Sequence, residues 1–298
     1  MRSFDVIGFG ALNTDRIGEV DQVVVDAEVM VRKERVDAGG SAANTICALS
    51  NLGMKTAVIG LVGDDREGRV QMESLRRYGV CDDFVKVQNG AQTGLVLGLS
   101  DDSNHRALYI YPGLNDAVSW TDLPNIDTVM VDCVHLSSFV SKKQLELQKR
   151  FVSNLSKSVL VSLAPGMVYA RFGIEAIEPL VSRCNILFLN KEELTELIPG
   201  DWKRAVIQLC KTGVGCIVVT DGSRGSCCFD GRDFLYASSE SASVVDTTGA
   251  GDAFAAGFLY GYLGENELKQ CLKMGSVMAA SVVSQMGARQ GFLSEIEL

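Results

Sequence analysis

The segment 244–262 constrains the fold of this chain more than any other stretch, because it joins two kinds of secondary structure through glycine. It reads VVDTTGAGDAFAAGFLYGY. The β-branched pair at its start predicts the end of a strand, and Phe254 and Phe258, four residues apart, predict a helix after it. Gly249 and Gly251 lie between them. We therefore expect a strand that leads through a glycine turn into the N-terminus of a helix.

Most of the remaining chain repeats this alternation of strand and helix. Apolar runs typical of strands occur at 6–8, 57–62, 128–131, 159–163, 186–189 and 216–220. Helical patterns separate most of these runs. Strands spaced by helices predict an α/β fold in which a mostly parallel sheet is covered by helices on both faces, with ligands at the carboxyl ends of the strands.

Two regions lack this alternation. The first, within 15–38, is rich in valine with charges between, and predicts a strand pair from 19 to 36 with one solvated face. The second, within 92–112, reads as a hairpin around the turn cluster DDSN at 101–104. We expect a single domain, 1–298, in which these two regions form a small β lid.

Composition excludes several classes of protein. The 298 residues carry a net charge of −9, which argues against nucleic acid or an anionic membrane as a partner. No apolar run approaches the ~20 residues needed to cross a bilayer, and the chain starts with a strand pattern rather than a signal peptide. The nine cysteines include no CxxC pair, and most lie in apolar stretches. We expect buried thiols and a cytoplasmic protein.

The glycine turn also predicts an anion-binding site. Backbone N–H groups in the first turn of a helix lack intrahelical partners and lie at the positive end of the helix dipole. Gly249, Ala250 and Gly251 carry little or no side chain, so a phosphate group can approach these N–H groups closely. Asp252 follows directly, and it could take a proton from an alcohol during phosphoryl transfer. The alternative is a glycine turn with Asp252 as an ordinary helix-start residue.

Two motifs in order resemble the signatures of the ribokinase-like (PfkB) carbohydrate and nucleoside kinase family. DTTGAGD at 246–252 resembles the C-terminal signature, and GGSAAN at 39–44 resembles the N-terminal one. The match covers essentially the whole chain. The resemblance implies a kinase that transfers the γ-phosphoryl group of ATP, with Mg²⁺, to a hydroxymethyl group of a sugar. In it Asp252 is the base, and the GAGD turn holds the phosphoryl group.

The resemblance places the phosphoryl acceptor near the N-terminal motifs. The positions it assigns to the acceptor are Asn13, Asp15, Gly39, Gly40 and Asn44. From the residues alone, Asn13 and Asp15 would suit hydrogen bonds to sugar hydroxyls from a loop at a strand end, and an Asx turn is the alternative. Ser41 could cap the helix that follows.

The chain departs from ribokinases at two places near the expected acceptor. Ser41 stands where ribokinases often carry lysine, and 137–139 contains no glutamate, although ribokinases often place one there. Both departures favour an acceptor other than ribose. A nucleoside kinase on the same fold is therefore the first alternative.

The resemblance also assigns nucleotide and metal positions. Those expected near the nucleotide are Asn190, Thr220, Gly222, Gly225 and Ser276. Glu193 would hold Mg²⁺ through water. Those expected around a monovalent cation such as K⁺ are Asp246, Thr248, Gln285 and Gly287. Without the resemblance, 220–225 reads as a glycine turn, and Glu193 as a first-turn acid stabilised by the helix dipole.

Two alternatives from other classes remain. A non-catalytic regulator that binds a sugar or nucleotide is disfavoured by the intact Asp252 and its glycine turn. An NAD-dependent oxidoreductase is disfavoured because Gly8 and Gly10 lack the third glycine of a dinucleotide fingerprint. Lid strands with exposed faces would also allow a homodimer.

Overall fold

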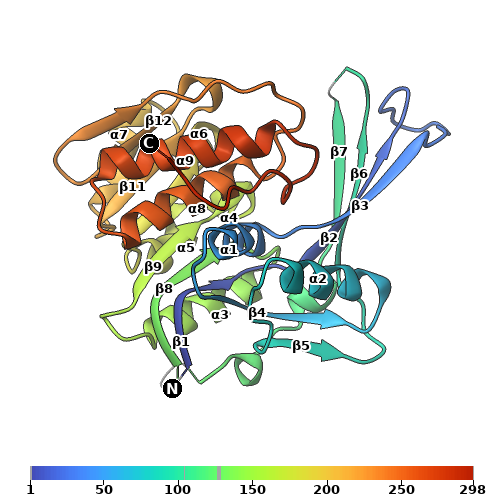
Figure 1. Ribbon diagram of the computed structural model, residues 1–298, viewed down its shortest axis with the longest axis horizontal. Helices are drawn as coiled ribbons and strands as arrows, with labels where there is room; N and C mark the ends of the chain where they lie inside the picture. Colours follow the sequence, from blue (N-terminus) through green and yellow to red (C-terminus); the bar gives the residue numbers. More distant parts are fainter. Residues whose placement is uncertain (1, 104, 126–128, 298) are drawn as a thin grey trace.

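The computed structural model describes residues 2–103, 105–125 and 129–297. It contains a large sheet wrapped by helices and a smaller sheet that projects to one side (Figure 1). The large sheet has the strand order β13-β12-β11-β10-β9-β8-β1-β4-β5. Its strands are β1 (Arg2–Phe9), β4 (Thr56–Gly63), β5 (Val85–Gln88), β8 (Val129–Ser137), β9 (Leu160–Ala164), β10 (Ile186–Asn190), β11 (Cys216–Thr220), β12 (Ser226–Phe229) and β13 (Phe234–Ala237). Among the described strands of this sheet, only the pairs β11–β12 and β12–β13 are antiparallel, so the predicted, mostly parallel sheet is confirmed.

Helices cover both faces of the large sheet. One face carries α1 (Ser41–Asn51), α2 (Arg66–Arg77), α8 (Ala250–Leu263) and α9 (Leu268–Val283). The other carries α3 (Lys142–Ser153), α4 (Gly166–Phe172), α5 (Ile174–Val181), α6 (Lys191–Leu197) and α7 (Trp202–Cys210). The helices on each face enclose an apolar core, and strand β4 contributes to both: Ile59 packs in one core and Val58 in the other. Both faces of this strand are buried, which is why its sequence is apolar after Thr56.

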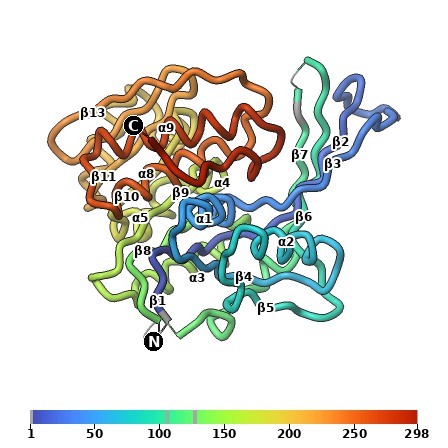
Figure 2. The backbone as a smooth tube through the Cα atoms, viewed as in Figure 1, coloured from blue at the N-terminus to red at the C-terminus, as the bar shows by residue number. Residues whose placement is uncertain are grey.

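The smaller sheet has the order β3-β2-β6-β7; its base contacts α2, and its far end projects away from the helices, as the tube drawing also shows (Figure 2). Its strands are β2 (Asn13–Glu19), β3 (Lys33–Ala38), β6 (Gly94–Ser100) and β7 (Arg106–Tyr111). Strands β6 and β7 form the antiparallel hairpin predicted around 101–104, of which Asn104 lies outside the described residues. Asn13 and Asp15 belong to β2 and not to a loop, which corrects the expectation from sequence.

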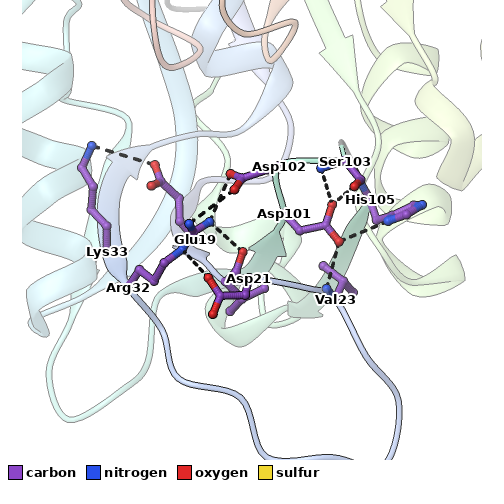
Figure 3. A network of polar contacts seen from close by, with 10 residues as sticks. Glu19, Asp21, Val23, Arg32, Lys33, Asp101, Asp102, Ser103 and His105 are labelled. Atoms are coloured by element: carbon purple, nitrogen blue, oxygen red, sulfur yellow. Dashed lines mark hydrogen bonds and ion pairs between the residues drawn. The ribbon is translucent and has the colours of Figure 1, made fainter.

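The strand pair predicted from 19 to 36 is present as β2 and β3, which pair antiparallel, but the valine-rich segment 20–32 is not part of it. The strands lie on either side of it, and Val25 within it is 94% exposed. Polar contacts hold this segment against the tip of the β6–β7 hairpin (Figure 3). Val23 N donates to the Asp101 carboxylate at 2.9 Å, and Arg32 pairs with Asp102 at 3.1 Å. Charged side chains therefore hold in place a segment in which Val20 is buried but most of the other valines are exposed.

The segment before α8 is also not the strand end that its β-branched pair predicted. Val244 and Val245 are exposed, and the sheet ends before them at β13. Val245 N instead donates to Val283 O at the end of α9, at 2.8 Å. The glycine turn and the helix after it are as predicted, since Gly249 caps α8 with a φ of +79°.

This topology gathers the motifs at one edge of the large sheet. The parallel strands β1, β10 and β11 end there, and α1, α6 and α8 begin there. Among the described helices, none combines the length and the apolar character needed to pass through a membrane.

Candidate active site

Asp252 lies where the N-termini of α1 and α8 meet. Its Oδ1 accepts a hydrogen bond from Ser41 Oγ at 2.6 Å, and its Oδ2 accepts one from Asn44 Nδ2 at 2.8 Å. Ser41 is thus the first residue of α1 and a partner of Asp252, rather than the cap that the sequence suggested. The N-cap is Gly40, which makes no side-chain capping bond. The GGSAAN and GAGD motifs, far apart in sequence, therefore form one site.

The glycine pair before α1 is required by close backbone and side-chain neighbours. Gly40 has a φ of +94°, and a β-carbon there would collide with Ala11 O. A β-carbon on Gly39 would collide with the Asp15 carboxylate. Side chains at these two positions would therefore displace Asp15 or the backbone at Ala11, just after β1.

Two carboxyl groups near this junction have pKa values well above their usual range. Burial raises the pKa of Asp252 to about 6, while hydrogen bonds from Ser41 and Asn44 and the charge of Arg289 oppose the shift. Burial also raises the pKa of Asp15 to about 7, opposed chiefly by Arg289 and reinforced by Asp37. At neutral pH Asp252 is therefore mostly ionised, the form that can accept a proton.

A cleft of about 520 Å³ opens on one side of the glycine turn, between the loop after β11 and α9. We call it the α9 cleft. Among its lining residues are Thr220, Gly222, Gly225, Ala250, Gly251 and Ser276. Four of the five positions predicted for the nucleotide thus share one cavity. Asn190 is not among its lining residues and instead caps α6, where its Oδ1 accepts from Glu193 N at 2.8 Å.

A second cleft, of about 680 Å³, lies between the smaller sheet and the segment before α8. We call it the sheet cleft. It is lined by Asp15, Ile17, Arg35, Asp37, Val96, Ile110, Asp246, Thr248, Met286 and others. Thr247, Ala250 and Gly251 face the α9 cleft, whereas Asp246 and Thr248 face the sheet cleft. The turn therefore separates the two clefts, and Asp252, which is partly exposed, follows directly after it.

The other predicted acceptor residues do not line the sheet cleft. Asn13 directs its Oδ1 to Asn115 Nδ2, at 2.8 Å. Asn44 contacts Asp252 instead, as described above. Asn115 also donates to Leu12 O and accepts from Leu12 N, which fixes the start of β2. Nothing in the sequence around Asn115 indicated this role.

Glu193 fits the predicted contact with Mg²⁺ through water. Its Oε2 accepts from Asn190 N at 3.0 Å, while its Oε1 accepts no hydrogen bond from the described residues. Burial and the nearby Asp252 charge raise the pKa of Glu193, so a cation nearby would favour the ionised form. The described residues hold no cluster of three or more His, Cys, Asp or Glu side chains.

The side chain of Asp246, expected to bind a monovalent cation, is already engaged in hydrogen bonds and an ion pair. Asp246 Oδ1 accepts from Thr248 N and Oγ1, and its Oδ2 accepts from Gly287 N at 3.0 Å. The guanidinium of Arg35 also lies 3.3 Å from Oδ2 and pairs with Asp37 at 2.7 Å. A cation bound to the Asp246 carboxylate would have to displace Arg35, so these side chains do not fit one. Gln285 lies in the same loop as Gly287, just after α9.

Comparison with known proteins places this arrangement in a class. A family model described as pfkB family carbohydrate kinase matches residues 4–295. A protein of Archaeoglobus fulgidus named an uncharacterized sugar kinase is 35% identical over 84% of this chain and 99% of its own. An ATP-dependent ribose-1-phosphate kinase of Halopiger xanaduensis is 29% identical over 95% of this chain and 93% of its own.

Solved structures agree on the fold. Arabidopsis thaliana ribokinase, complexed with ribose and ATP, superposes with a TM-score of 0.85 at 25% identity, covering 98% of this chain and 96% of that one. Methanocaldococcus jannaschii nucleoside kinase superposes with a TM-score of 0.84 at 23% identity, with the same coverage of both chains. The fold is thus that of the ribokinase-like kinases. The chain belongs to the pfkB family of carbohydrate kinases, and it is a phosphotransferase that acts on a sugar or a nucleoside.

Proposed function

We propose that this protein transfers the γ-phosphoryl group of ATP to a hydroxymethyl group of a sugar, with Asp252 as the base. The observation that carries the proposal is the position of Asp252. It is a partly exposed, mostly ionised carboxylate in the first turn of α8, directly after the turn that separates the two clefts. ATP would occupy the α9 cleft, and the acceptor the sheet cleft.

The glycine turn would hold the phosphoryl group during transfer. Ala250 N donates weakly to Thr247 O, at 3.3 Å, and Gly251 N has no acceptor among the described residues. A β-carbon at Gly251 would meet nothing within 4 Å, so a phosphate could come close to the backbone. These N–H groups and the dipole of the 14-residue α8 would stabilise charge on the transferring group. Mg²⁺, held through water by Glu193, would supply further positive charge.

On the acceptor side, Asp252 would take the hydroxyl proton as the oxygen attacks phosphorus. In a loose transition state the proton leaves late, so a carboxylate with a pKa of about 6 is a sufficient base. Ser41 donates to Asp252 Oδ1 in this structure, and the acceptor hydroxyl would share or replace that bond. Asp15 lines the sheet cleft and would accept hydrogen bonds from other hydroxyls of the acceptor. The smaller sheet would act as a lid over this site.

A nucleoside is the second candidate acceptor. The sheet cleft combines polar side chains with an apolar wall of Ile17, Val96, Ile110 and Met286. A wall of this kind suits a flat heterocyclic base as well as the carbon face of a sugar. Relatives with 24–26% identity to this chain are named nucleoside kinases.

The exposed face of the smaller sheet supports a homodimer as part of the proposal. Leu97, Tyr109 and Tyr111 are 43%, 65% and 50% exposed on paired strands. Apolar side chains in such number are typical of a covered surface. Sedimentation equilibrium would report a dimer if the sheets pair and a 32.1 kDa monomer if they do not.

A ligand panel with a catalytic readout tests the function. Thermal unfolding is followed with single sugars and nucleosides, with and without ATP and Mg²⁺, and each stabilising compound is then assayed for ADP release. A kinase releases ADP stoichiometrically with phosphorylation of one acceptor class. A regulator would be stabilised by ligands without releasing ADP, and that outcome would contradict the proposal.

A further inference from the structure

Arg289 is a buried cation that the proposed reaction does not use. The residue is 4% exposed and lies in the loop after α9. Its guanidinium donates from Nε to Asn44 Oδ1 at 2.8 Å, from Nη1 to Ser74 Oγ at 2.8 Å and from Nη2 to Gly39 O at 2.7 Å. All of these partners are neutral, as is Gln71 Oε1 at 3.4 Å. A guanidinium buried among neutral partners costs free energy unless a nearby charge stabilises it.

The bond from Nε to Asn44 fixes the orientation of an amide that touches the base. Asn44 Oδ1 accepts from Arg289, so Asn44 Nδ2 is the atom that faces Asp252 Oδ2, at 2.8 Å. If the amide turned over, its oxygen would face the carboxylate and its NH₂ would face the guanidinium. Both contacts would then be repulsive. Arg289 therefore makes Asn44 a donor to Asp252.

The charge of Arg289 acts on the same carboxylate. It lowers the pKa of Asp252 against the rise caused by burial, and it lowers the pKa of Asp15 in the same way. The charge of Asp252 in turn raises the pKa of two acids nearby, Asp15 on β2 and Glu193 on α6. Without Arg289, burial would hold a larger share of Asp252 in the protonated form at neutral pH.

We propose that Arg289 is a positioning residue for catalysis: it places a buried positive charge near Asp252 and holds this carboxylate, through Asn44, in the orientation that receives the acceptor proton. The proposal rests on the kinase function proposed above. It also accounts for the bond to Gly39 O, because the same guanidinium holds the glycine pair that packs against Asp15. Arg289 thus connects the C-terminal loop to Asn44, which contacts Asp252, and to Gly39, which packs against Asp15.

The test compares the pH dependence of kcat in two variants of the full chain. Arg289→Met removes charge and hydrogen bonds, and we expect the acid limb of its kcat profile to move up by about one pH unit. Arg289→Lys keeps the charge, but its ammonium group cannot reproduce the planar arrangement of donors on the guanidinium. Its acid limb should stay near that of the wild type while its plateau kcat falls about tenfold, the loss expected for one hydrogen bond to a charged group. An Arg289→Met profile with an unmoved acid limb would overturn the proposal.

Ser74→Ala is the matched control. It deletes a partner of Nη1 and leaves the Nε bond to Asn44, so its pH profile should be that of the wild type. If its acid limb moved as far as that of Arg289→Met, a general loss of packing around Arg289 would explain both shifts, and the proposal would fail. Should Arg289→Met not fold, Arg289→Lys decides, because a wild-type plateau in that variant contradicts the positioning role.

The proposed function fails in a different way. It is wrong if the wild type has no kinase activity or if Asp252→Asn remains fully active. An active wild type, an inactive Asp252→Asn and an unchanged Arg289→Met profile would together remove only the role of Arg289.

Discussion

Asp15 and Asp252 are carboxyl groups whose burial works against the folded state at neutral pH. A group with a raised pKa in the folded protein binds its proton more tightly there than in the unfolded chain. Stability is therefore lost as the pH rises from the unfolded pKa of about 4 to the folded values, about 7 for Asp15 and about 6 for Asp252. Such groups are typical of functional sites, where a charge is needed in spite of its cost.

Asp15→Asn should therefore stabilise the protein at pH 8 while weakening acceptor binding. The amide removes the buried charge, and no described residue donates a side-chain hydrogen bond to Asp15 that the change would break. We expect the free energy of unfolding at pH 8 to rise by about 1 kcal/mol, which corresponds to about 2–4 °C in Tm for a chain of this size. The gain should shrink towards pH 4, where the wild-type carboxyl is protonated. Thermal unfolding at both pH values checks this, and an equal Tm difference at pH 4 and pH 8 would refute it.

At the scale of elements, the two glycines that frame the start of α8 have separable roles. Gly249 has a left-handed φ, and a β-carbon there would lie 2.7–2.8 Å from Ala288 atoms. Gly251 is helical, and its β-carbon would meet nothing within 4 Å, although the residue lines the α9 cleft. One glycine is thus required by the fold, and the other leaves room in the cleft.

Alanine substitution at the two positions should give opposite results. Gly249→Ala should lower stability by about 2 kcal/mol, through strain and the clash with Ala288. Gly251→Ala should keep or slightly raise stability, because alanine favours the helix, but it should reduce kcat, because its methyl group would occupy space near the phosphoryl group. Denaturant unfolding and steady-state kinetics on both variants test the separation. A fully active Gly251→Ala enzyme would argue against phosphate binding at this turn.

The elements that sequence predicted correctly are those specified by local chemistry. The apolar strands of the large sheet, the glycine turn at 249 and the turn cluster of the β6–β7 hairpin were all predicted. The valine-rich segment 20–32 was not, because β propensity does not show whether a core exists for the valines to enter.

The site was predicted only where a motif marked it. Asp252 and the glycines were found in this way, whereas Arg35 and Arg289 were missed. Arg35 contacts Asp246, 211 positions away, and Arg289 contacts Asn44, 245 positions away. No pattern along the chain encodes such contacts.

At the scale of the whole molecule, the two apolar cores explain the cysteine content. All nine cysteines lie in the described part of the chain, and no disulfide joins them. Seven are buried, while Cys81 and Cys210 are partly exposed. Burial also raises the thiol pKa values of Cys133, to about 12, and Cys271, to about 11, which further lowers reactivity.

A thiol titration should therefore distinguish the native from the unfolded chain. With an excess of a disulfide reagent such as DTNB, no more than two thiols should react promptly in the native protein, and nine should react after unfolding. ATP and Mg²⁺ should leave the native count unchanged, since neither Cys81 nor Cys210 lines the α9 cleft. Prompt reaction of more than two thiols would contradict the packing of the two cores.

The central claim is that Asp252 accepts the proton of the acceptor hydroxyl, and the most direct measurement is the kcat of Asp252→Asn beside its affinity for ATP. The account predicts that kcat falls by a factor of about 10²–10⁴, the usual contribution of a general base, while the Kd for ATP stays within about threefold of the wild-type value. An Asp252→Asn enzyme that turns over at the wild-type rate would contradict the account.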